Sequence, residues 1–553
     1  MTTDLRRRVA DWIATDPDDT DRRTLRSLLD SDDLVELDRR FATPLRFGTA
    51  GLRGPEMAGP AGMNRATVRR ATQGVLAWLN EIGVDAARGV VVGRDARHGS
   101  ERFNDEVVTT LLGAGAVVYE MPSPLPTPYV PYCVRACGAA AGIMITASHN
   151  PRDENGFKLY GPDGAQIVAP DDATVERHAS GAGPAAAADR SARGHSIVTP
   201  ETFVAYRDHF VQRFGVVEDS NLAITYTPMH GVGGETMRQL LSDAGFARVD
   251  VVRSQFVPDG SFPTLRFPNP EEAGALDHAV VAANTAGSTL IIANDPDADR
   301  LGAAVRGPEG WRILRGDEIG WLLGSSLLDD IRVAGQCVAT SIVSSTLLEK
   351  MARSADVTCV TTLTGFKWIS RAAPWGELGF GYEEALGFAV DPCVPDKDGL
   401  SAGLALCHLA HTLSREGRTL LDELDDIESR FGVHATAQLA WRAESEHDLG
   451  EMRGRIARLL AAPPGSVGPL NVDEVIDLSD GWRAAPPTEG VVLGFAGDGR
   501  VVIRPSGTEA KVKAYFEVTP PRVGTLAAQR ERAADVVASL QRDVAALLRE
   551  QVS

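Results

Sequence analysis

Cysteines and long apolar stretches are both scarce in this chain of 553 residues. Its six cysteines are too few for a disulfide framework, and Cys133 and Cys137 have no second pair at zinc-site spacing. This cysteine usage favours a reducing, cytoplasmic location. No segment has the roughly 18 consecutive apolar residues that a membrane span needs. Near the N-terminus, Leu5, Val9 and Trp12 recur at helical spacing without a cleavage site, which predicts an amphipathic helix and not a signal peptide.

Positive charge is also in deficit. The chain has 56 Lys plus Arg against 75 Asp plus Glu, a formal net charge of −19. This charge repels nucleic acid and anionic membranes at long range, so neither is expected as a partner. An anionic substrate would therefore need locally clustered cations. The length alone favours three to five domains.

Short apolar, β-branched runs alternate with helix-like segments along most of the chain. These runs lie at 89–93, 141–148, 222–228, 288–295 and 335–345. Because they show little polar alternation, they suit strands covered on both faces, as in α/β folds with parallel sheets. The Ala/Gly/Ser-rich segment 179–196 predicts a mobile connection.

Breaks in composition divide the chain into four expected domains. Three α/β domains are predicted at 1–205, 206–315 and 316–432, followed by an α+β domain at 433–553. No short-period repeat is present, although the three α/β blocks are similar enough in length to share a topology.

Ser148 follows an apolar run and precedes His149, Asn150 and Pro151. Ligands in open α/β folds bind where the chain leaves the sheet edge, so this position favours a reactive hydroxyl. The alternative is a turn serine that only makes turn hydrogen bonds. The glycines of a hydrolase nucleophile elbow are missing, which disfavours acyl transfer.

Asp295, Asp297 and Asp299 alternate directly after an apolar strand. In an extended chain these side chains point the same way, and Pro296 disfavours a helix. Three adjacent carboxylates repel one another unless a divalent cation holds them, and oxygen ligands suit Mg²⁺ or Mn²⁺. A solvated acidic turn is the alternative. A calcium EF-hand is excluded because Arg300 stands where its sixth position needs glycine.

A stretch near the C-terminus offers donors for a phosphate group. It contains Arg504, Ser506, Gly507 and Thr508. Glycine permits close backbone approach, the hydroxyls donate hydrogen bonds and arginine offers a planar fork. A ligand-free turn is the alternative. If Ser148 carried a phosphoryl group, its oxygens would complete the cation site of the three aspartates.

The segment 381–399 places Glu383 and Glu384 between glycines. Carboxylates that accept hydrogen bonds from neighbouring hydroxyls are a usual device for binding sugars. Two adjacent glutamates in a solvated loop are the alternative.

Taken in order, these four loops resemble those of the α-D-phosphohexomutase superfamily, whose members move phosphate between C1 and C6 of a hexose phosphate. "TASHNP" is similar to the family's phosphoserine loop, "DPDADR" to its metal loop, "GYEEALGF" to its sugar loop and "RPSGTE" to its phosphate loop. Further matches lie at 47–54, 93–100 and 362–368. The resemblance implies four domains around a central cleft: three α/β domains of shared topology and a smaller, mobile C-terminal α+β domain, each giving one loop.

The resemblance also implies residue roles. One Mg²⁺ per chain would be bound by Ser148, once phosphorylated, and by Asp295, Asp297 and Asp299. Lys158 would act as general acid/base, with His149 and Arg53 nearby. The substrate-binding residues would be Arg300, Lys367, Glu383, Glu384, Arg504, Ser506, Gly507 and Thr508.

Three of these roles have alternatives. Lys158 could be a surface lysine paired with Asp153 or Glu154, and His149 could serve only as a hydrogen-bonding group. Glu383 could replace Glu384 as the sugar ligand if the alignment shifts by one. Four residues of the segment 93–100 are expected to brace the serine loop and not to touch substrate: Arg94, Asp95, Arg97 and Ser100.

The expected activity is interconversion of hexose 1-phosphate and hexose 6-phosphate, with small-molecule sugar phosphates as partners of a monomer or dimer. Direct transfer between C1 and C6 of one sugar is geometrically awkward. An enzyme phosphate given to one end and recovered from the other needs only that the bisphosphate turn around. A sugar 1,6-bisphosphate would therefore be both intermediate and activator.

The sugar loop departs from the common family pattern, because Leu386 and Phe388 stand where most members have Ser and His. With "TLTGFKW" and "DKDG", this pattern resembles the phosphoglucomutase-2 and phosphopentomutase-like subgroup. Glucose is the expected sugar, with mannose and pentose phosphates as alternatives. A serine-dependent phosphatase usually needs two metals with histidine ligands, which the sequence does not indicate, and a non-catalytic sensor would need broken loops.

Overall fold

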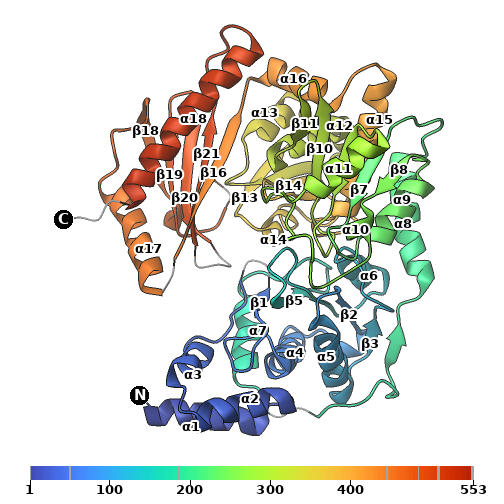
Figure 1. Ribbon diagram of the computed structural model, residues 1–553, viewed down its shortest axis with the longest axis vertical. Coiled ribbons are helices and arrows are strands. Elements are labelled where there is room, and N and C mark those ends of the chain that lie inside the picture. The colour runs from blue at the N-terminus through green and yellow to red at the C-terminus, as the bar shows by residue number, and fades with distance from the viewer. Residues whose placement is uncertain are drawn as a thin grey trace. The chain divides into compact units, whose positions relative to one another are not determined.

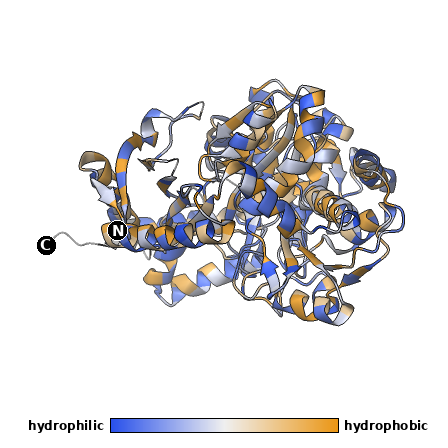
Figure 2. Cartoon of the chain, turned by 90° about the horizontal axis from the view of Figure 1, so that it is seen from above, coloured by the Kyte–Doolittle hydropathy of each residue, from blue (hydrophilic) through white to orange (hydrophobic). Residues whose placement is uncertain are grey.

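Figure 1 shows the computed structural model, in which the described residues are 2–48, 51–183, 186–443, 446–483, 485–497, 499–506 and 511–549. The chain splits into two compact units. Unit 1 comprises Met1–Ile313 and Cys393–His408, and unit 2 comprises Leu314–Pro392 and Leu409–Ser553. The helices carry both hydrophobic and hydrophilic residues, as helices that pack on one face do (Figure 2). None of the helices in the described ranges is long and apolar enough to cross a bilayer.

Unit 1 begins with a small helical layer. It consists of α1 (Thr2–Thr15), α2 (Asp19–Asp30) and α3 (Leu34–Phe41). Their apolar faces meet in a separate core that includes Val9, Trp12 and Leu25. The predicted amphipathic N-terminal helix is confirmed, and its core is continued by further helices.

The first sheet has the strand order β1-β5-β4-β2-β3-β6. Its strands are β1 (Leu52–Pro55), β2 (Val90–Arg94), β3 (Val118–Glu120), β4 (Ala141–Ile145), β5 (Glu154–Tyr160) and β6 (His195–Ile197). The helices between and after them are α4 (Arg65–Glu81), α5 (Ser100–Gly113), α6 (Tyr129–Ala136), α7 (Asp171–Ser180) and α8 (Pro200–Phe214). Every residue of β4 is buried, which explains its unbroken apolar sequence.

The end of segment 179–196 is part of this sheet, so the expectation of a mobile connection is wrong there. The residues of β6 pair in parallel with β3. Just before β6, Arg190 donates to Glu120 through Nε at 2.9 Å and through Nη2 at 2.8 Å. The Ala/Gly/Ser-rich composition concealed a strand of only three residues.

The second sheet, also in unit 1, has the order β11-β10-β9-β7-β8. Its strands are β7 (Ile224–Thr227), β8 (Val249–Val251), β9 (Leu290–Ala293), β10 (Gly302–Gly307) and β11 (Gly310–Ile313). The helices of this region are α9 (Gly234–Asp243), α10 (Arg253–Phe256) and α11 (Asp277–Ala286).

The third sheet lies in unit 2 and has the order β13-β12-β14-β15. Its strands are β12 (Cys337–Ser341), β13 (Cys359–Thr362), β14 (Leu378–Glu383) and β15 (Gly387–Ala389). The helices of this region are α12 (Gly316–Ala334), α13 (Leu347–Ser354), α14 (Phe366–Ile369) and α16 (Leu420–Phe431). Helix α15 (Gly399–Arg415) begins in unit 1 and ends in unit 2.

The fourth sheet is antiparallel throughout, with the order β16-β21-β20-β19-β18-β17. Its strands are β16 (Ala435–Arg442), β17 (Ser466–Val467), β18 (Leu470–Asp477), β19 (Val491–Phe495), β20 (Gly499–Pro505) and β21 (Lys511–Val518). With α17 (Glu446–Ala461) and α18 (Leu526–Arg549) it encloses its own core. The prediction of a C-terminal α+β domain is confirmed.

The first three sheets share one topology. In each, a first strand (β2, β7 or β12) pairs in parallel with the second and third strands, and the fourth strand pairs antiparallel with the third. The shared topology implied by the family resemblance is therefore confirmed. The exact domain boundaries stay a prediction, and α8 runs across the one expected after residue 205.

This shared topology gives three of the motif loops the same place in the fold. The connection from third to fourth strand holds Ser148 after β4, the three aspartates after β9, and Glu384 after β14. Each connection also contains a non-glycine residue with positive φ: Ser148 at 54°, Ala298 at 59° and Leu386 at 63°. Such backbone is uncommon outside glycine and clusters at functional sites.

Candidate active site

Ser148 lies in the tight turn that follows β4 and is fully buried. Its backbone N–H donates to Oγ1 of Thr146 at 2.8 Å, and its Oγ donates to Oδ2 of Asp295 at 2.7 Å. Nδ1 of His149 lies 3.2 Å from the same Oγ. The hydroxyl therefore faces the aspartate loop, at the sheet edge where it was expected.

Arg97 braces the serine loop, as the sequence predicted. Its Nη2 donates to the carbonyl oxygens of Ser148 and Asn150, both at 2.6 Å. Its Nη1 donates to the carbonyl oxygens of Pro151 at 2.7 Å and Glu154 at 3.0 Å. One buried guanidinium thus holds four carbonyl groups between Ser148 and Glu154.

The carboxylates of Asp295, Asp297 and Asp299 converge, as predicted. Their oxygens lie within 4.8 Å of one another, and all three side chains are fully buried. The reason given for convergence is wrong, because β9 ends at Ala293 and the acids lie on a turn and not on extended chain. The left-handed backbone of Ala298 brings Asp299 back toward the other two.

Two lysines form ion pairs with this triad. Nζ of Lys158, on β5, donates to Oδ2 of Asp297 at 2.6 Å and to Oδ2 of Asp299 at 2.5 Å. Nζ of Lys397 lies 2.9 Å from the same oxygen of Asp299. Because Lys158 is fully buried, the alternative of a surface pair with a neighbouring acid is wrong.

Sequence reasoning missed two residues here. Lys397 belongs to the "DKDG" segment. Thr127 donates from Oγ1 to Oδ2 of Asp297 at 2.6 Å, and from its backbone N–H to the carbonyl of Asp297 at 2.8 Å. Both residues are distant in sequence from the aspartates, and their neighbours in the sequence give no signal of these contacts.

Burial and charge act on the three acids in opposite directions. Burial raises the pKa of Asp295 well above its ordinary value, and the charges of Asp297 and Asp299 add to this. Burial alone would also raise the pKa of Asp299, but Lys158 and Lys397 outweigh it and hold that pKa below its ordinary value. The triad is thus a partly compensated cluster of negative charge.

The aspartates fit a divalent cation. Oδ1 of Asp297 and Oδ1 of Asp299 are buried and accept no hydrogen bond from the described part of the chain. Leaving a buried carboxylate oxygen without a partner is costly, and an oxygen-seeking cation is the natural partner for such a set. The triad can therefore hold a metal ion.

Arg53, Arg300 and His149 surround the serine. Nη1 of Arg53 donates to Oδ1 of Asn150 at 3.3 Å, and its buried Nε has no hydrogen-bond partner among the described residues. The backbone N–H of Arg300 donates to Oδ1 of Asp295 at 3.0 Å. Burial, followed by the charges of Arg300 and Arg53, holds the pKa of His149 well below its ordinary value. His149 is therefore a neutral imidazole at physiological pH.

In unit 2, Glu384 lies just past β14. Its Oε2 accepts from the hydroxyls of Ser344 at 3.1 Å and Ser341 at 3.2 Å. Burial, with the charges of Glu383 and Asp317, raises the pKa of Glu384 to about 7. These donors are serines of the protein itself, so the sugar-binding role of Glu384 stays a prediction.

The two positions that depart from the common family pattern face the protein interior. Leu386 is buried, and Phe388 is fully buried on β15, where its ring stacks on that of Tyr382 with centroids 6.4 Å apart. Lys367 is buried on α14, and Glu383 is the buried last residue of β14.

The phosphate-loop candidates are described in part. Arg504 is on β20, and its buried Nε has no hydrogen-bond partner among the described residues. The backbone N–H of Ser506 donates to the carbonyl of Lys511 at 2.7 Å. Gly507 and Thr508 lie outside the described residues.

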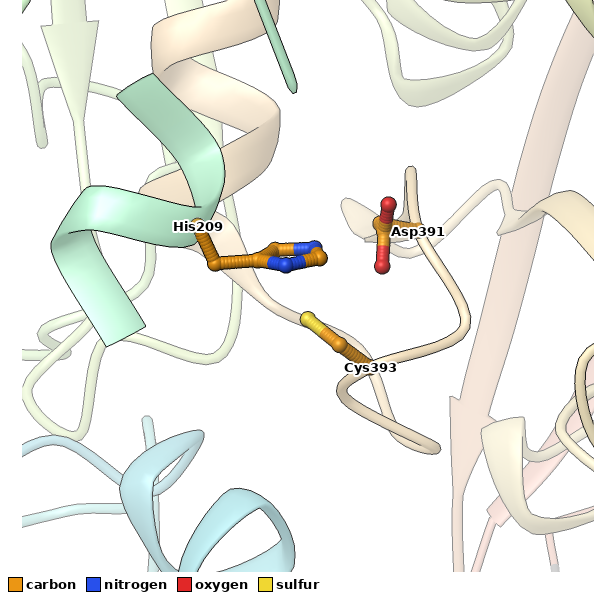
Figure 3. A group of neighbouring side chains, drawn as sticks. All are labelled: His209, Asp391 and Cys393. Carbon is orange, nitrogen blue, oxygen red and sulfur yellow. The ribbon is translucent and has the colours of Figure 1, made fainter. Parts of the chain in front are cut away.

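A second set of ligand-type side chains includes His209 on α8 and Cys393 (Figure 3). Both are half-buried, and the ring of His209 packs edge-on against Phe210 with centroids 5.1 Å apart. Asp391, labelled in the same picture, belongs to unit 2. Within unit 1, the described residues of this group supply only two ligands, fewer than the three or four of a zinc site.

Four family models match the chain in series. They describe phosphoglucomutase/phosphomannomutase α/β/α domain I at 44–184, domain II at 204–309, domain III at 315–431 and the C-terminal domain at 468–534. A Haemophilus influenzae protein named probable phosphomannomutase is 37% identical over 82% of this chain and 93% of its own length. Phosphopentomutase of Mus musculus is 32% identical over 94% of this chain and 91% of its own length.

Solved structures agree on the fold. A phosphoglucomutase/phosphomannomutase family protein from Burkholderia thailandensis matches 92% of this chain and 98% of its own, with a TM-score of 0.69 at 19% identity. The phosphoglucomutase parafusin from Paramecium matches with the same TM-score at 16% identity and covers 92% and 96% of the two chains. The chain belongs to the phosphoglucomutase/phosphomannomutase family of isomerases.

Proposed function

We propose that the chain is a phosphosugar mutase that interconverts hexose 1-phosphate and hexose 6-phosphate through a phosphorylated Ser148 and a sugar 1,6-bisphosphate. One observation carries the proposal. Oγ of Ser148 lies 2.7 Å from Asp295, within a fully buried triad in which Asp297 and Asp299 each have one carboxylate oxygen without a hydrogen-bond partner among the described residues. Membership of the family supports the class of reaction.

Asp295, Asp297 and Asp299, together with phosphorylated Ser148, would hold one Mg²⁺. When bound, the cation supplies neutralising charge to the phosphoryl oxygens and favours attack at phosphorus. The chain itself supplies the neighbouring cations Lys158, Lys397 and Arg300.

The first half-reaction moves the phosphoryl group from serine to sugar. The bond between Oγ of Ser148 and phosphorus breaks while phosphorus bonds to a sugar hydroxyl oxygen. The sugar hydroxyl gives up its proton, and Oγ of Ser148 gains one. We assign proton transfer at the sugar to Lys158, while His149, a neutral imidazole 3.2 Å from Oγ, can exchange a proton with the serine.

The second half-reaction is the reverse, with the bisphosphate turned so that its other phosphate faces Ser148. That phosphate returns to Oγ, and the isomeric monophosphate leaves. The bisphosphate also phosphorylates Ser148 when added from outside, which makes it the expected activator. Arg53 would steady the serine loop through its hydrogen bond to Asn150.

The non-reacting end of the substrate needs separate ligands. Those assigned to its phosphate are Arg504, Ser506, Gly507 and Thr508, and those assigned to the sugar are Glu384, Glu383 and Lys367, with Arg300 near the transferring group. The support for Glu384 is its pair of serine hydroxyls and its place on a connection equivalent to that of Ser148.

Glucose is the first sugar to test, and two observations favour rivals. The Haemophilus relative carries the name phosphomannomutase, and the mouse relative, matched over 94% of this chain, carries the name phosphopentomutase. A side-by-side kcat/KM panel on the 1-phosphates of glucose, mannose, ribose and deoxyribose would rank them.

The proposal is tested by interconversion of glucose 1-phosphate and glucose 6-phosphate with Mg²⁺ and a catalytic amount of glucose 1,6-bisphosphate. Inorganic phosphate is measured in parallel, because a phosphatase would release it in proportion to turnover. We expect interconversion without phosphate release, and we expect Ser148→Ala to lose both turnover and covalent labelling by the bisphosphate. Near-normal labelling of Ser148→Ala would overturn the proposal.

A further inference from the structure

Glu517, on β21 of the C-terminal sheet, is a buried carboxylate with many donors. Its Oε1 accepts from Oγ of Ser345 at 2.8 Å, from the N–H and Oγ1 of Thr346 at 2.7 and 3.0 Å, and lies 2.8 Å from Nδ1 of His434. Its Oε2 accepts from Nε of Arg500 at 3.0 Å. Burial alone would raise the pKa of Glu517, but Arg500 and His434 outweigh it and lower that pKa to about 2. The side chain is therefore ionised.

The hydrogen bonds around Glu517 continue through Arg500 and Ser344 to Glu384, the candidate sugar ligand. Nη2 of Arg500 donates to the carbonyl of Ser344 at 2.5 Å. Oγ of Ser344 donates to Oε2 of Glu384 at 3.1 Å and accepts from the N–H of Glu384 at 3.2 Å. Glu517 thus reaches Glu384 through Arg500 and one serine.

The segment 342–346, which contains Ser344, is the connection after the first strand of its sheet. The equivalent connection of the first sheet contains Arg97, which fixes the serine loop. In the second sheet, the N–H of Val232 donates to the carbonyl of Pro296 in the aspartate loop at 2.8 Å. In all three sheets, therefore, the connection after the first strand braces the connection after the third.

In the third sheet, the bracing connection is itself held by charged residues of the C-terminal sheet. The N–H of Ser345 donates to Oδ1 of Asp317 on α12 at 2.8 Å, which fixes one side of the segment. On the other side, the partners are Glu517 and Arg500, from β21 and β20. The segment 342–346 has no charged side chain of its own, because its sequence is Ile-Val-Ser-Ser-Thr. The charges that hold it therefore come from other elements.

We infer that Glu517, with Arg500, is a positioning residue through which the C-terminal sheet sets the geometry of Glu384 for the sugar. An ionised, buried carboxylate that loses its charge leaves Arg500 uncompensated and several donors poorly paired, so segment 342–346 shifts. The effect of Glu517 on sugar binding rests on the proposed function. The effect of Glu517 on segment 342–346 does not.

The test compares Glu517→Gln with Glu120→Gln. Glu120 is a matched control, because it is also a buried carboxylate held by an arginine and a histidine, Arg190 and His195, but in unit 1. Both variants should lose thermal stability. Only Glu517→Gln should raise the KM for the sugar 1-phosphate, by about tenfold, with kcat changed by less than about threefold.

A double variant tests whether the residues act in series. If Glu517 works through Ser344, the KM of Glu517→Gln/Ser344→Ala should be no higher than that of the worse single variant. Single-variant effects that multiply, or an unchanged KM in Glu517→Gln, would overturn the inference. If Glu517→Gln does not fold, Arg500→Lys keeps the charge but loses the planar fork that bonds Glu517 through Nε and the Ser344 carbonyl through Nη2, and the same comparisons apply.

Amide hydrogen exchange separates this inference from the proposed function. Inactivity of the wild-type chain on every sugar phosphate would refute the proposed function alone. Even then, Glu517→Gln should speed exchange in both 342–347 and 384–386, while Glu120→Gln leaves both segments at the wild-type rate. Faster exchange confined to 342–347 would show that Glu384 is not positioned through this network.

Discussion

Nζ of Lys397 lies 2.9 Å from Oδ2 of Asp299, the oxygen that also accepts from Lys158. A cation so close to one member of the triad opposes binding of another cation there. We therefore expect Lys397→Met to tighten Mn²⁺ binding by about tenfold or more, measured by titration with the free ion followed by electron paramagnetic resonance. The readout is metal affinity and does not depend on turnover.

Arg193→Met is the control for this effect, because it removes an exposed cation that is not in the site. Its Mn²⁺ affinity should match that of the wild type within about twofold. Weaker Mn²⁺ binding in Lys397→Met would contradict the electrostatic argument and indicate that Lys397 helps to form the site.

The second prediction concerns Arg97, whose guanidinium group donates to four carbonyl oxygens of the serine loop. Lysine keeps the charge but cannot reach four acceptors in one plane, so Arg97→Lys should lose about 2–4 kcal/mol of unfolding free energy. Displacement of Ser148 should also lower kcat by about tenfold to a hundredfold. Denaturant unfolding and steady-state kinetics measure the two effects.

The partly exposed Arg102 on α5, whose Nη2 lies 3.4 Å from Glu56, provides the comparison. Arg102→Lys should change the unfolding free energy by no more than about 0.5 kcal/mol, because exposed ion pairs contribute little. Equal losses in both variants would show that the four carbonyl contacts of Arg97 do not carry the effect.

The loops of the site could be predicted from the sequence because the residues that identify each loop are neighbours in the sequence. An apolar run that ends in polar residues marks the end of a buried strand, and this pattern placed Ser148 and the aspartates where strands end. Local rules misjudged the path of the chain within the aspartate loop. There a left-handed Ala298, and not an extended segment, brings the acids together.

Contacts between distant segments were beyond the sequence. Lys397 and Thr127 reach the triad from separate segments, and nothing in their neighbours predicts that meeting. Glu517 sits in "KVKAYFEV", which reads as an ordinary strand, and its donors come from three other segments. Such networks depend on tertiary packing, which local propensity does not encode.

Phe388 makes a third prediction, because it occupies the family's histidine position but is fully buried and stacked on Tyr382. Restoring the common residue with Phe388→His places a polar ring in this core. We expect a loss of about 2–4 kcal/mol of unfolding free energy and no change in the ratio of kcat/KM between glucose and mannose 1-phosphates. Phe388→Leu, which stays apolar, should lose less. A stable Phe388→His with an altered sugar ratio would contradict the buried placement.

Glu384 makes a prediction about pH, because burial and neighbouring charge raise its pKa from 4.5 to about 7. The folded chain then binds this proton more tightly than the unfolded chain does. The resulting stability is fully present below about pH 4.5 and is lost as the pH rises through 7, by at most roughly 3 kcal/mol. Glu384→Gln has no such proton, so its unfolding free energy relative to wild type should rise between pH 5 and 8.

The difference in unfolding free energy between the wild type and Glu384→Gln isolates the contribution of Glu384. Asp398, whose pKa burial raises to about 6, gives a slope of the same sign, but it is present in both proteins and cancels. If the ionised form of Glu384 accepts hydrogen bonds from the sugar, the wild-type KM should fall as the pH rises through 7. The KM of Glu384→Gln should keep only the change due to the substrate's own phosphate. Parallel stability curves and parallel KM profiles would together show that Glu384 does not titrate in this range.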